Sequence, residues 1–338
     1  MSAPSPLPFG CVEELRLLLA ARGLELQLTQ LAGGLLRGDL LALRLGELRL
    51  LRIRLDRPLH ARGAKDPRQQ LICLDLTPPQ RAGPCRSHGQ LLPATAVYGL
   101  ARSGEVHLTL PARTDLALLL LPLESFHRRR LQLGVEALEE RVLARNWLQL
   151  DPQRFTDLAL TLRRLCAAAL HHPAQAALLE RDLWPLLLEA LAQAAGLGPR
   201  LLRPPARIEL VKATQRWLDD HPDQPLALED LCRMVYGSRR SLIQGFRDHL
   251  GMGPMAYLKL QRLHGARRSL LRADPAGATV LAVATHHGFL NPGHFARDYR
   301  RLFGEPPSAS LQRGTGASGL AFNPAPAPAS APPPGRSG

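Results

Sequence analysis

The chain has 338 residues, of which 45% are apolar and 21% are charged, which is the composition of a globular protein with room for two or more domains. Its 43 basic and 29 acidic residues give a net charge of +14. The stretch from Arg207 to Arg313 holds 16 basic and 10 acidic residues and so accounts for only +6 of it. Because the positive charge is not concentrated in one region, it supports a nucleic-acid partner only weakly. Five cysteines without a C-x-x-C pair argue against a disulfide framework and a zinc knuckle. The sequence has neither a signal peptide nor an apolar run long enough to span a bilayer, so we expect a cytoplasmic protein.

The first half of the chain begins with a short helix and continues with short alternating strands. The apolar spacing from Val12 to Gly23 predicts an amphipathic helix that ends at Gly23. After it, leucines recur at every second position, and turn residues stand at Gly33-Gly34, Gly38-Asp39 and Gly46-Glu47. This pattern predicts a closed or sandwiched antiparallel β unit. The alternating positions are Leu24, Leu26 and Leu28; Leu41, Leu43 and Leu45; Leu48 and Leu50; Ile53 and Leu55; Leu74 and Leu76; and Val106, Leu108 and Leu110.

A β unit of this kind could hold one small ligand or could be packed solid, and the sequence leaves both alternatives open. Its histidines, His60, His88, His107 and His127, are scattered, and no His-x-His pair supplies two ligands to one ion. We therefore expect no metal site and no cofactor. The identity of an effector is not predicted.

The segment between Gly134 and Gly196 has a helical period. Leucines and alanines form two stripes that could be ordinary core or could pack on a second copy of the chain. Gly196-Leu-Gly-Pro and Arg203-Pro-Pro then predict a linker, and the Pro-rich tail after Arg313 cannot bury enough apolar surface to order itself. The stripes are Leu158, Leu162, Leu165 and Ala169, and Leu179, Leu183, Leu187 and Leu191.

The segment from Glu229 to Ser308 contains an internal repeat with an offset of 53 residues. The repeat includes an apolar stripe at every fourth position, followed by a glycine and a proline. Its pairs are Leu242 and Phe295, Phe246 and Tyr299, Arg247 and Arg300, Leu250 and Phe303, Gly251 and Gly304, and Pro254 and Pro307.

Each copy has the pattern of a short helix, a tight turn and a second helix. In the first copy Tyr236-Gly237 breaks the helix and Ser238 can cap the next one. In the second copy Gly288-Phe289 breaks the helix, Asn291 can cap the next one, and Pro292 suits its first position. A helix-turn-helix presents the outer face of its second helix to the major groove of DNA.

The faces opposite the two apolar stripes are polar and basic. Arginine and glutamine can bind base edges bidentately, so these faces predict DNA contacts. The alternative is a helical bundle whose basic face is only solvated. The predicted DNA-binding residues are Ser238, Arg239, Arg240, Ile243, Gln244 and Arg247 in the first copy, and Asn291, His294, Arg297, Arg300 and Arg301 in the second.

One predicted helix joins the two copies. It runs from Pro254 to about Ala273, with apolar residues at helical intervals. A helix of roughly 20 residues is about 30 Å long, close to one turn of DNA, which is about 34 Å. The two second helices could therefore enter successive major grooves on one face of a duplex.

These residues resemble the AraC/XylS family of transcription regulators over Ile208 to Arg313, about a third of the chain. The ending Pro307-Ser308-Ala309-Ser310-Leu311-Gln312-Arg313 is most similar to the ethanolamine operon regulators. Many members of the family carry a cupin-like β-barrel sensor at the N-terminus. The resemblance rests on Asp230-Leu231-Cys232, Ser238 to Phe246, Leu250-Gly251, Pro254, Tyr257-Leu258, Arg262-Leu263, Ala266, Gly288-Phe289, Phe295, Arg297, Tyr299 and Phe303-Gly304 to Pro307.

The resemblance implies which side chains read bases, and two positions depart from the family pattern. Ala227 stands where a capping Ser or Thr is usual, which costs about 1 kcal/mol of local helix stability. Gly293 offers no side chain to a base. The base-reading positions that the resemblance implies are Arg240, Ile243 and Gln244 in the first motif, and Pro292, Gly293, His294 and Arg297 in the second.

The sequence thus predicts an α+β chain. It consists of a cupin-like antiparallel β unit at residues 1–134 and a helical linker, which is also a possible dimerisation segment, at 135–206. A DNA-binding domain with two helix-turn-helix motifs follows at 207–313, and a tail at 314–338. The expected function is sequence-specific regulation of transcription, as an activator, with promoter DNA and RNA polymerase as partners. A small-molecule effector and a homodimer are compatible with it, and a membrane is not a partner. The alternatives are a cupin-type metal enzyme or an alkyl-repair protein fused to a DNA-binding domain, and a scaffold whose helical repeat binds protein.

Overall fold

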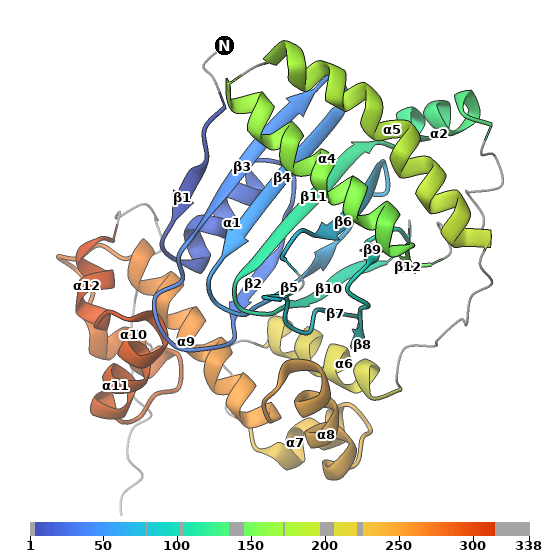
Figure 1. The fold of residues 1–338 in the computed structure, drawn as a ribbon. Helices are drawn as coiled ribbons and strands as arrows, with labels where there is room; N and C mark the ends of the chain where they lie inside the picture. The colour runs from blue at the N-terminus through green and yellow to red at the C-terminus, as the bar shows by residue number, and fades with distance from the viewer. Residues whose placement is uncertain are drawn as a thin grey trace, which may run out of the picture.

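A computed structural model describes residues 4–78, 80–101, 104–134, 145–171, 173–196, 206–221 and 226–314. Two antiparallel sheets and their covering helices form the first part of the chain, and a group of short helices forms the second (Figure 1). The α+β fold with an antiparallel β unit before a helical region is therefore confirmed. The predicted linker at 197–205 and the tail from 315 onwards lie outside the described residues.

The larger sheet has seven strands and the smaller sheet has five. We call the two sheets, with helices α1 (Val12–Ala20) and α2 (Leu123–Gln132), the β unit. The larger sheet is ordered β1 (Leu7–Phe9), β3 (Gly38–Leu45), β4 (Leu48–Leu55), β11 (Thr114–Pro122), β6 (Gln69–Asp75), β9 (Ala96–Tyr98) and β12 (Trp147–Gln149). The smaller sheet is ordered β2 (Gln27–Gln30), β5 (Leu59–Ala64), β10 (Glu105–Leu110), β7 (Arg86–Ser87) and β8 (Gln90–Leu91).

The larger sheet is buried on both faces, which explains its unbroken apolar strand β11. Ala117, Leu119 and Leu121 point into a core shared with helices α4 (Pro152–His171) and α5 (Pro173–Gly196), which lie across this face in Figure 1. Leu118 and Leu120 point into the core between the two sheets, which α1 also closes. A strand covered on both faces needs apolar side chains at every position, so it loses the alternation that identifies a half-buried strand.

The predicted strands at 41–55 are confirmed as one hairpin, but one predicted turn is wrong. Gly46, with a φ of 56°, lies between β3 and β4 and forms their turn. Gly38 and Asp39, predicted as a turn, begin β3 instead. A Cβ atom at Gly38 would lie 2.1 Å from the carbonyl oxygen of Arg54, so this glycine allows close strand packing. Strand β12 lies beyond residue 134, where a helical linker is expected, and it pairs with β9.

The helical region consists of the helices from α6 to α12 and has two apolar cores, one for each copy of the repeat. Figure 1 places α6 directly beneath the smaller sheet, with α7 and α8 below it. None of the described helices is long and apolar enough to cross a membrane. The helices are α6 (Ala206–Asp220), α7 (Leu228–Met234), α8 (Arg239–Leu250), α9 (Pro254–Arg272), α10 (Val280–His286), α11 (Pro292–Phe303) and α12 (Pro307–Gln312).

Candidate nucleic-acid interface

The first helix-turn-helix motif is α7, a turn and α8. The hydroxyl of Ser238 accepts a hydrogen bond from the backbone N–H of Ser241 at 3.1 Å and so caps α8, as predicted. Gly251, with a φ of 71°, ends the helix in the left-handed conformation. Ala227 cannot cap α7 with its own side chain, but its backbone N–H donates to the carboxylate of Asp230 at 2.9 Å. One orphan donor at the start of α7 is therefore satisfied without a serine or threonine.

The second motif, α10, a turn and α11, repeats these devices. Asn291 caps α11 by accepting a hydrogen bond from the backbone N–H of His294 at 3.0 Å, and Pro292 is the first helical residue. Gly304, with a φ of 75°, ends the helix. Phe295 and Tyr299 lie 5.5 Å apart between ring centroids and form part of an aromatic series that fills this core. The repeat detected in the sequence therefore corresponds to two similar structural units.

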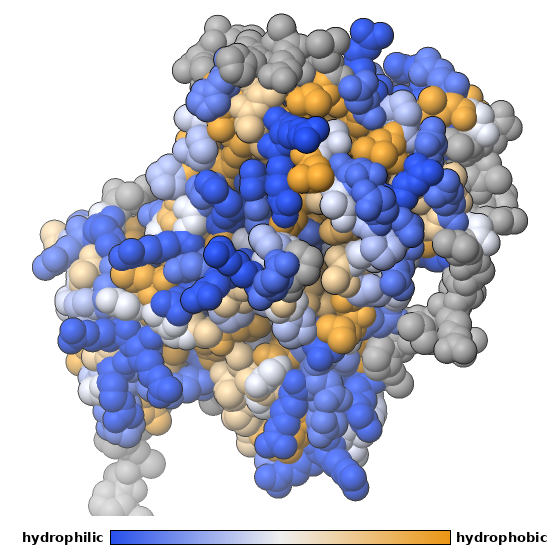
Figure 2. All heavy atoms as spheres, viewed as in Figure 1, coloured by the Kyte–Doolittle hydropathy of each residue, from blue (hydrophilic) through white to orange (hydrophobic). Residues whose placement is uncertain are grey.

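Both predicted apolar stripes are buried, which fixes the faces that remain free. Leu242 and Phe246 of α8 are fully buried, as is Tyr299 of α11. Because a helix that buries one face turns the opposite one outward, the polar residues between these positions point to solvent. Figure 2 shows hydrophilic residues gathered at the lower side of the molecule, over α7 and α8 and over α11.

The structure brings the predicted residues of the first motif to one exposed face. Ile243 is half-buried beside them. Arg239 lies 3.4 Å from a carboxylate oxygen of Glu229, and the amide of Gln244 donates to Asp248 at 2.7 Å. An exposed ion pair is weak, and both exposed contacts can exchange for a phosphate or a base. The exposed members are Ser238, Arg239, Arg240, Gln244 and Arg247.

The second motif presents a similar face with a larger excess of positive charge. Within the described residues, the side chains of His294, Arg297, Arg300 and Arg301 make no hydrogen bond or ion pair. Gly293 is exposed at the first turn of α11 and leaves that part of the face without a side chain. The exposed members are Asn291, Pro292, His294, Arg297, Arg300 and Arg301.

Helix α9 connects the motifs as one continuous helix, as predicted. It contains 19 residues, which corresponds to a length of about 28 Å. Tyr257 and Leu258 belong to the core of the first motif, whereas Leu263 and Leu270 belong to the core of the second. Met252 packs against both cores. Since α9 is part of both cores, the two motifs cannot move apart without disrupting one of them.

The β unit contacts the first motif through a buried polar cluster on α6. His107 donates from Nε2 to the Gln215 side-chain oxygen at 2.9 Å, and the amide of Gln215 donates to Nε2 of His60 at 3.2 Å. Burial lowers the pKa of His107 to about 4, so this ring is neutral at physiological pH. Lys212, also on α6, donates to Nδ1 of His88 at 3.0 Å.

Three histidines of the β unit that are scattered in the sequence lie close together in the structure. The rings of His60 and His107 lie 4.5 Å apart, and His88 lies 6.1 Å from His107. Strands β5 and β10 pair side by side, which brings positions 60 and 107 together although they are far apart in sequence. No group of three or more His, Cys, Asp or Glu in the described part of the chain has the arrangement of a metal site.

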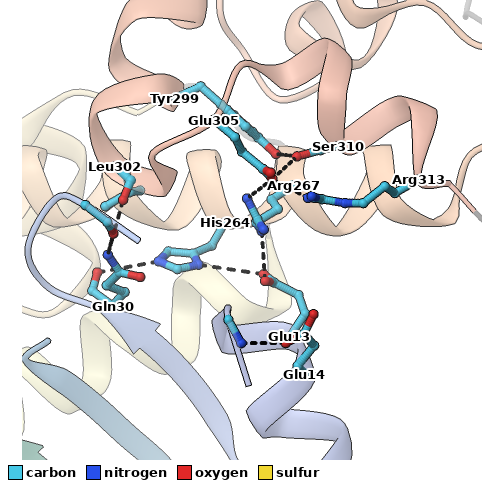
Figure 3. Close-up of polar contacts among 12 residues, drawn as sticks. Glu13, Glu14, Gln30, His264, Arg267, Tyr299, Leu302, Glu305, Ser310 and Arg313 are labelled. Atoms are coloured by element: carbon cyan, nitrogen blue, oxygen red, sulfur yellow. Dashed lines mark hydrogen bonds and ion pairs between the residues drawn. The ribbon is translucent and has the colours of Figure 1, made fainter. Parts of the chain in front are cut away.

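The β unit contacts the second motif through the end of α11 and through α9 (Figure 3). The backbone N–H of Gly34 donates to the carbonyl of Arg301 at 3.0 Å, and the side-chain amide of Gln30 donates to the carbonyl of Leu302 at 3.1 Å. Arg267 of α9 donates from Nε to Glu13 at 3.0 Å, and its Nη1 lies 2.8 Å from Glu305. The contacts of Gly34, Gln30 and Glu13 with the helical region were not predicted, because each joins residues more than 200 positions apart.

A model of the helix-turn-helix domain family matches residues 231–313. The "Probable thc operon regulatory protein" of Rhodococcus erythropolis is 43% identical over 114 residues, which cover 33% of this chain and 34% of that protein. The "XylDLEGF operon transcriptional activator 3" of Pseudomonas putida is 34% identical over 98 residues, which cover 29% of this chain and 30% of that protein. The chain thus matches about a third of the length of these relatives.

A solved structure, described as a probable AraC family transcriptional regulator from Rhodopseudomonas palustris, is 39% identical and covers 31% of this chain and 96% of its own, with a TM-score of 0.29. The residues matched by the family model run from the middle of α7 to the end of α12. Residues 231–313 of this chain therefore match a helix-turn-helix domain, and about a third of the chain is similar to proteins named as operon regulators.

Proposed function

We propose that this chain is a sequence-specific transcription regulator that binds promoter duplex DNA through both motifs and acts as an activator. The observation that carries the proposal is the attachment of two exposed basic faces, on α8 and α11, to the single helix α9. At about 28 Å, α9 comes near the length of one turn of B-DNA, so both faces can meet successive major grooves. Two relatives, each similar to about a third of this chain, are named as an operon regulatory protein and a transcriptional activator.

In this proposal the exposed residues divide into two roles. Arg240 lies in the first turn of α8, where a recognition helix reaches base edges, and Gln244 lies one turn later on the same face. Arg247 lies in the last turn, where the helix leaves the groove and meets the phosphate backbone. On α11, Gly293 offers no side chain, so this helix contributes mainly phosphate contacts and shape recognition, through Arg297, Arg300 and Arg301 among others.

The remaining partners belong to the same proposal. Residues 1–134 form a sensor domain for a small effector, 135–206 link it to the DNA-binding domain at 207–313, and 314–338 form a tail. The chain works in the cytoplasm on promoter DNA, with RNA polymerase as its protein partner and with a second copy through the helices after the β unit. We propose no catalytic activity. The similarity of residues 307–313 to ethanolamine operon regulators supports membership of that branch.

Arg240→Ala and Arg247→Ala test the division of roles. Arg240→Ala is expected to cost about 1–3 kcal/mol on the operator and to relax specificity, because a bidentate base contact is lost. Arg247→Ala is expected to weaken binding to all sequences alike, because a phosphate contact carries no sequence information. Binding of both variants to the operator, to operators with single base changes and to unrelated duplex measures the two effects.

Arg164→Ala is the matched control, since Arg164 is an exposed arginine on α4, on the far side of the larger sheet from the motifs. Its affinity should equal that of the unaltered chain. If Arg240→Ala and Arg247→Ala have the same selectivity profile, the assignment of base reading to the start of α8 is wrong.

A further inference from the structure

A cavity of about 350 Å³ lies where the β unit meets the helical region. Its walls come from α1 and β2 on one side and from α6, α9 and the end of α10 on the other. It is separate from the exposed faces of α8 and α11, none of whose predicted DNA-binding residues line it. The charged residues that line it are Arg16, Arg262, Arg268 and Arg272, with Glu13 and Asp219.

The two carboxylates of the cavity are already engaged by arginines outside it. Glu13 accepts a hydrogen bond from Arg267 at 3.0 Å, as Figure 3 shows, and Asp219 pairs with Arg62 at 2.5 Å. Burial would raise the pKa of Glu13, but His264 and Arg267 lower it to about 2, so this carboxylate is ionised and committed to those partners. The direct contacts of both acids therefore go to arginines outside the cavity, although their charges still act on Arg268 at longer range.

Three of these arginines, Arg16, Arg268 and Arg272, have few partners among the described residues. The Nε atom of Arg16 is buried and has no hydrogen-bond partner among the described residues. In the same part of the chain, no hydrogen bond or ion pair engages the guanidinium of Arg268 or Arg272. Burial lowers the pKa of Arg268. The negative charges of Glu13 and Asp219 raise it and the positive charges of Arg16 and Arg272 lower it, and the net direction is downward. A half-buried cluster of like charges is unfavourable unless something neutralises it.

We propose that this cavity binds a small anion with two or more negative charges, of the dicarboxylate or phosphate class. Guanidinium groups donate paired hydrogen bonds that match the oxygens of carboxylate and phosphate, and such charge-assisted bonds are strong where water is excluded. Arg16 from α1 and Arg268 from α9 hold the anion from opposite sides, and Arg272 closes the exposed rim. A volume of about 350 Å³ suits a small metabolite and excludes a long chain.

The anion bridges the β unit and the helix that sets the spacing of the two motifs. This consequence rests on the proposed function, since it makes the anion an effector of DNA binding. Arg16 belongs to the β unit, and Arg262, Arg268 and Arg272 belong to α9. An anion held between them stabilises the arrangement in which α1 packs beside α9 and disfavours any other. A ligand shifts an equilibrium only through such a difference in affinity between two arrangements.

The test measures anion binding by the full chain without DNA, so that its result does not depend on the proposed function. Isothermal titration calorimetry at constant ionic strength is carried out with inorganic phosphate and with succinate, and succinamide serves as the uncharged analogue of succinate. The variants are Arg16→Gln and Arg268→Gln, with Arg268→Lys to retain the charge. Arg164→Gln is the matched control, because Arg164 is an exposed arginine outside the cavity.

The unaltered chain and Arg164→Gln are expected to bind at least one of the two anions with equal affinity, and none of the chains to bind succinamide. Arg16→Gln and Arg268→Gln should each weaken binding by about tenfold or more, the size expected for loss of a charge-assisted hydrogen bond, and Arg268→Lys should weaken it less. Without anion, the melting temperature of Arg268→Gln should equal or exceed that of the unaltered chain, because a repelled charge is removed.

Several outcomes would overturn the proposal. The first is that the chain binds neither phosphate nor succinate. The second is that Arg164→Gln weakens anion binding as much as Arg268→Gln does. The third is a lower melting temperature of ligand-free Arg268→Gln than of the unaltered chain, which would make Arg268 a structural residue. A final arm adds unrelated duplex DNA. If the duplex displaces the anion and Arg16→Gln also loses affinity for that duplex, the cavity holds the DNA backbone and not a small anion.

Discussion

Arg267→Met is expected to lower the free energy of unfolding by about 3–5 kcal/mol, the cost of removing one partner from a buried ion pair. The side chain of Arg267 is 3% exposed and bridges Glu13 of the β unit and Glu305 of the helical region, both of which are largely buried. Its guanidinium also lies 4.6 Å from the ring centroid of Phe303. Methionine keeps much of the apolar stem but leaves Glu13 buried without its arginine.

Urea unfolding of the full chain measures this loss. The matched control is Arg128→Met, because Arg128 and Glu47 form an exposed pair at 3.7 Å, with side chains 58% and 44% exposed. The control should lose no more than about 1 kcal/mol. A loss of the same small size in Arg267→Met would show that the junction between the β unit and α9 does not depend on this ion cluster.

Binding to the operator is expected to fall about a thousandfold between 50 and 200 mM salt, since a protein that neutralises about six phosphates has a slope near −5 in log K against log salt. The arginines available for phosphates on both motifs are exposed, among them Arg247, Arg300 and Arg301. The segment from Ile208 to Arg313 should retain this slope, because both apolar cores of the helical region lie almost entirely within it.

Fluorescence anisotropy with a labelled operator, repeated over a series of salt concentrations, measures the slope. Arg300→Ala should reduce its magnitude by about 1, the amount expected for one lost phosphate contact. Arg164→Ala should leave it unchanged. A flat salt response on the best site would contradict the assignment of these faces to DNA.

The helical region could be predicted closely from sequence because its signals are local. The cap at Ser238, the proline at position 292 and the glycine at 304 act on neighbouring backbone atoms, and the apolar stripes repeat within a single helix. The caps and the continuous α9 follow the prediction for this reason. The assignment of DNA contacts to single residues stays a prediction, since exposure places a side chain on a face without showing what it binds.

The β unit was predicted only in part. Strand β10 was identified because its apolar residues alternate with polar ones: Leu108 and Leu110 pack in the core between the sheets, whereas His107 contacts Gln215 of α6. Strand β11 is buried on both faces, and β7 and β8 have two residues each, so no period of two marks them. The turn wrongly placed at Gly38 shows a similar limit, because a glycine required by a neighbouring strand resembles a glycine in a turn.

The junction between the two parts could not be predicted. Gln215 and His107, like Arg267 and Glu13, are brought together by tertiary packing alone. Single buried polar residues of this kind have no local spacing that marks them. Their types are nevertheless a weak signal, because a buried arginine or histidine requires a partner, and an apolar helix face interrupted by Arg267 indicates one.

The spacing of the half-sites tests the central claim most directly, since a continuous α9 holds the two recognition helices about one DNA turn apart. The affinity of the full chain is measured for the native operator and for versions with 5 bp and 10 bp inserted between the half-sites. The native operator should bind most tightly. An insertion of 5 bp turns one half-site to the opposite face of the duplex, and an insertion of 10 bp moves that half-site one further turn along it. In either case both motifs can bind their half-sites only if the duplex bends, which costs about 1–6 kcal/mol. Both inserted operators should therefore lose at least about fivefold in affinity while keeping the sequence preference of the first half-site. Equal affinity for all three operators would mean that the motifs bind independently, which would contradict the account.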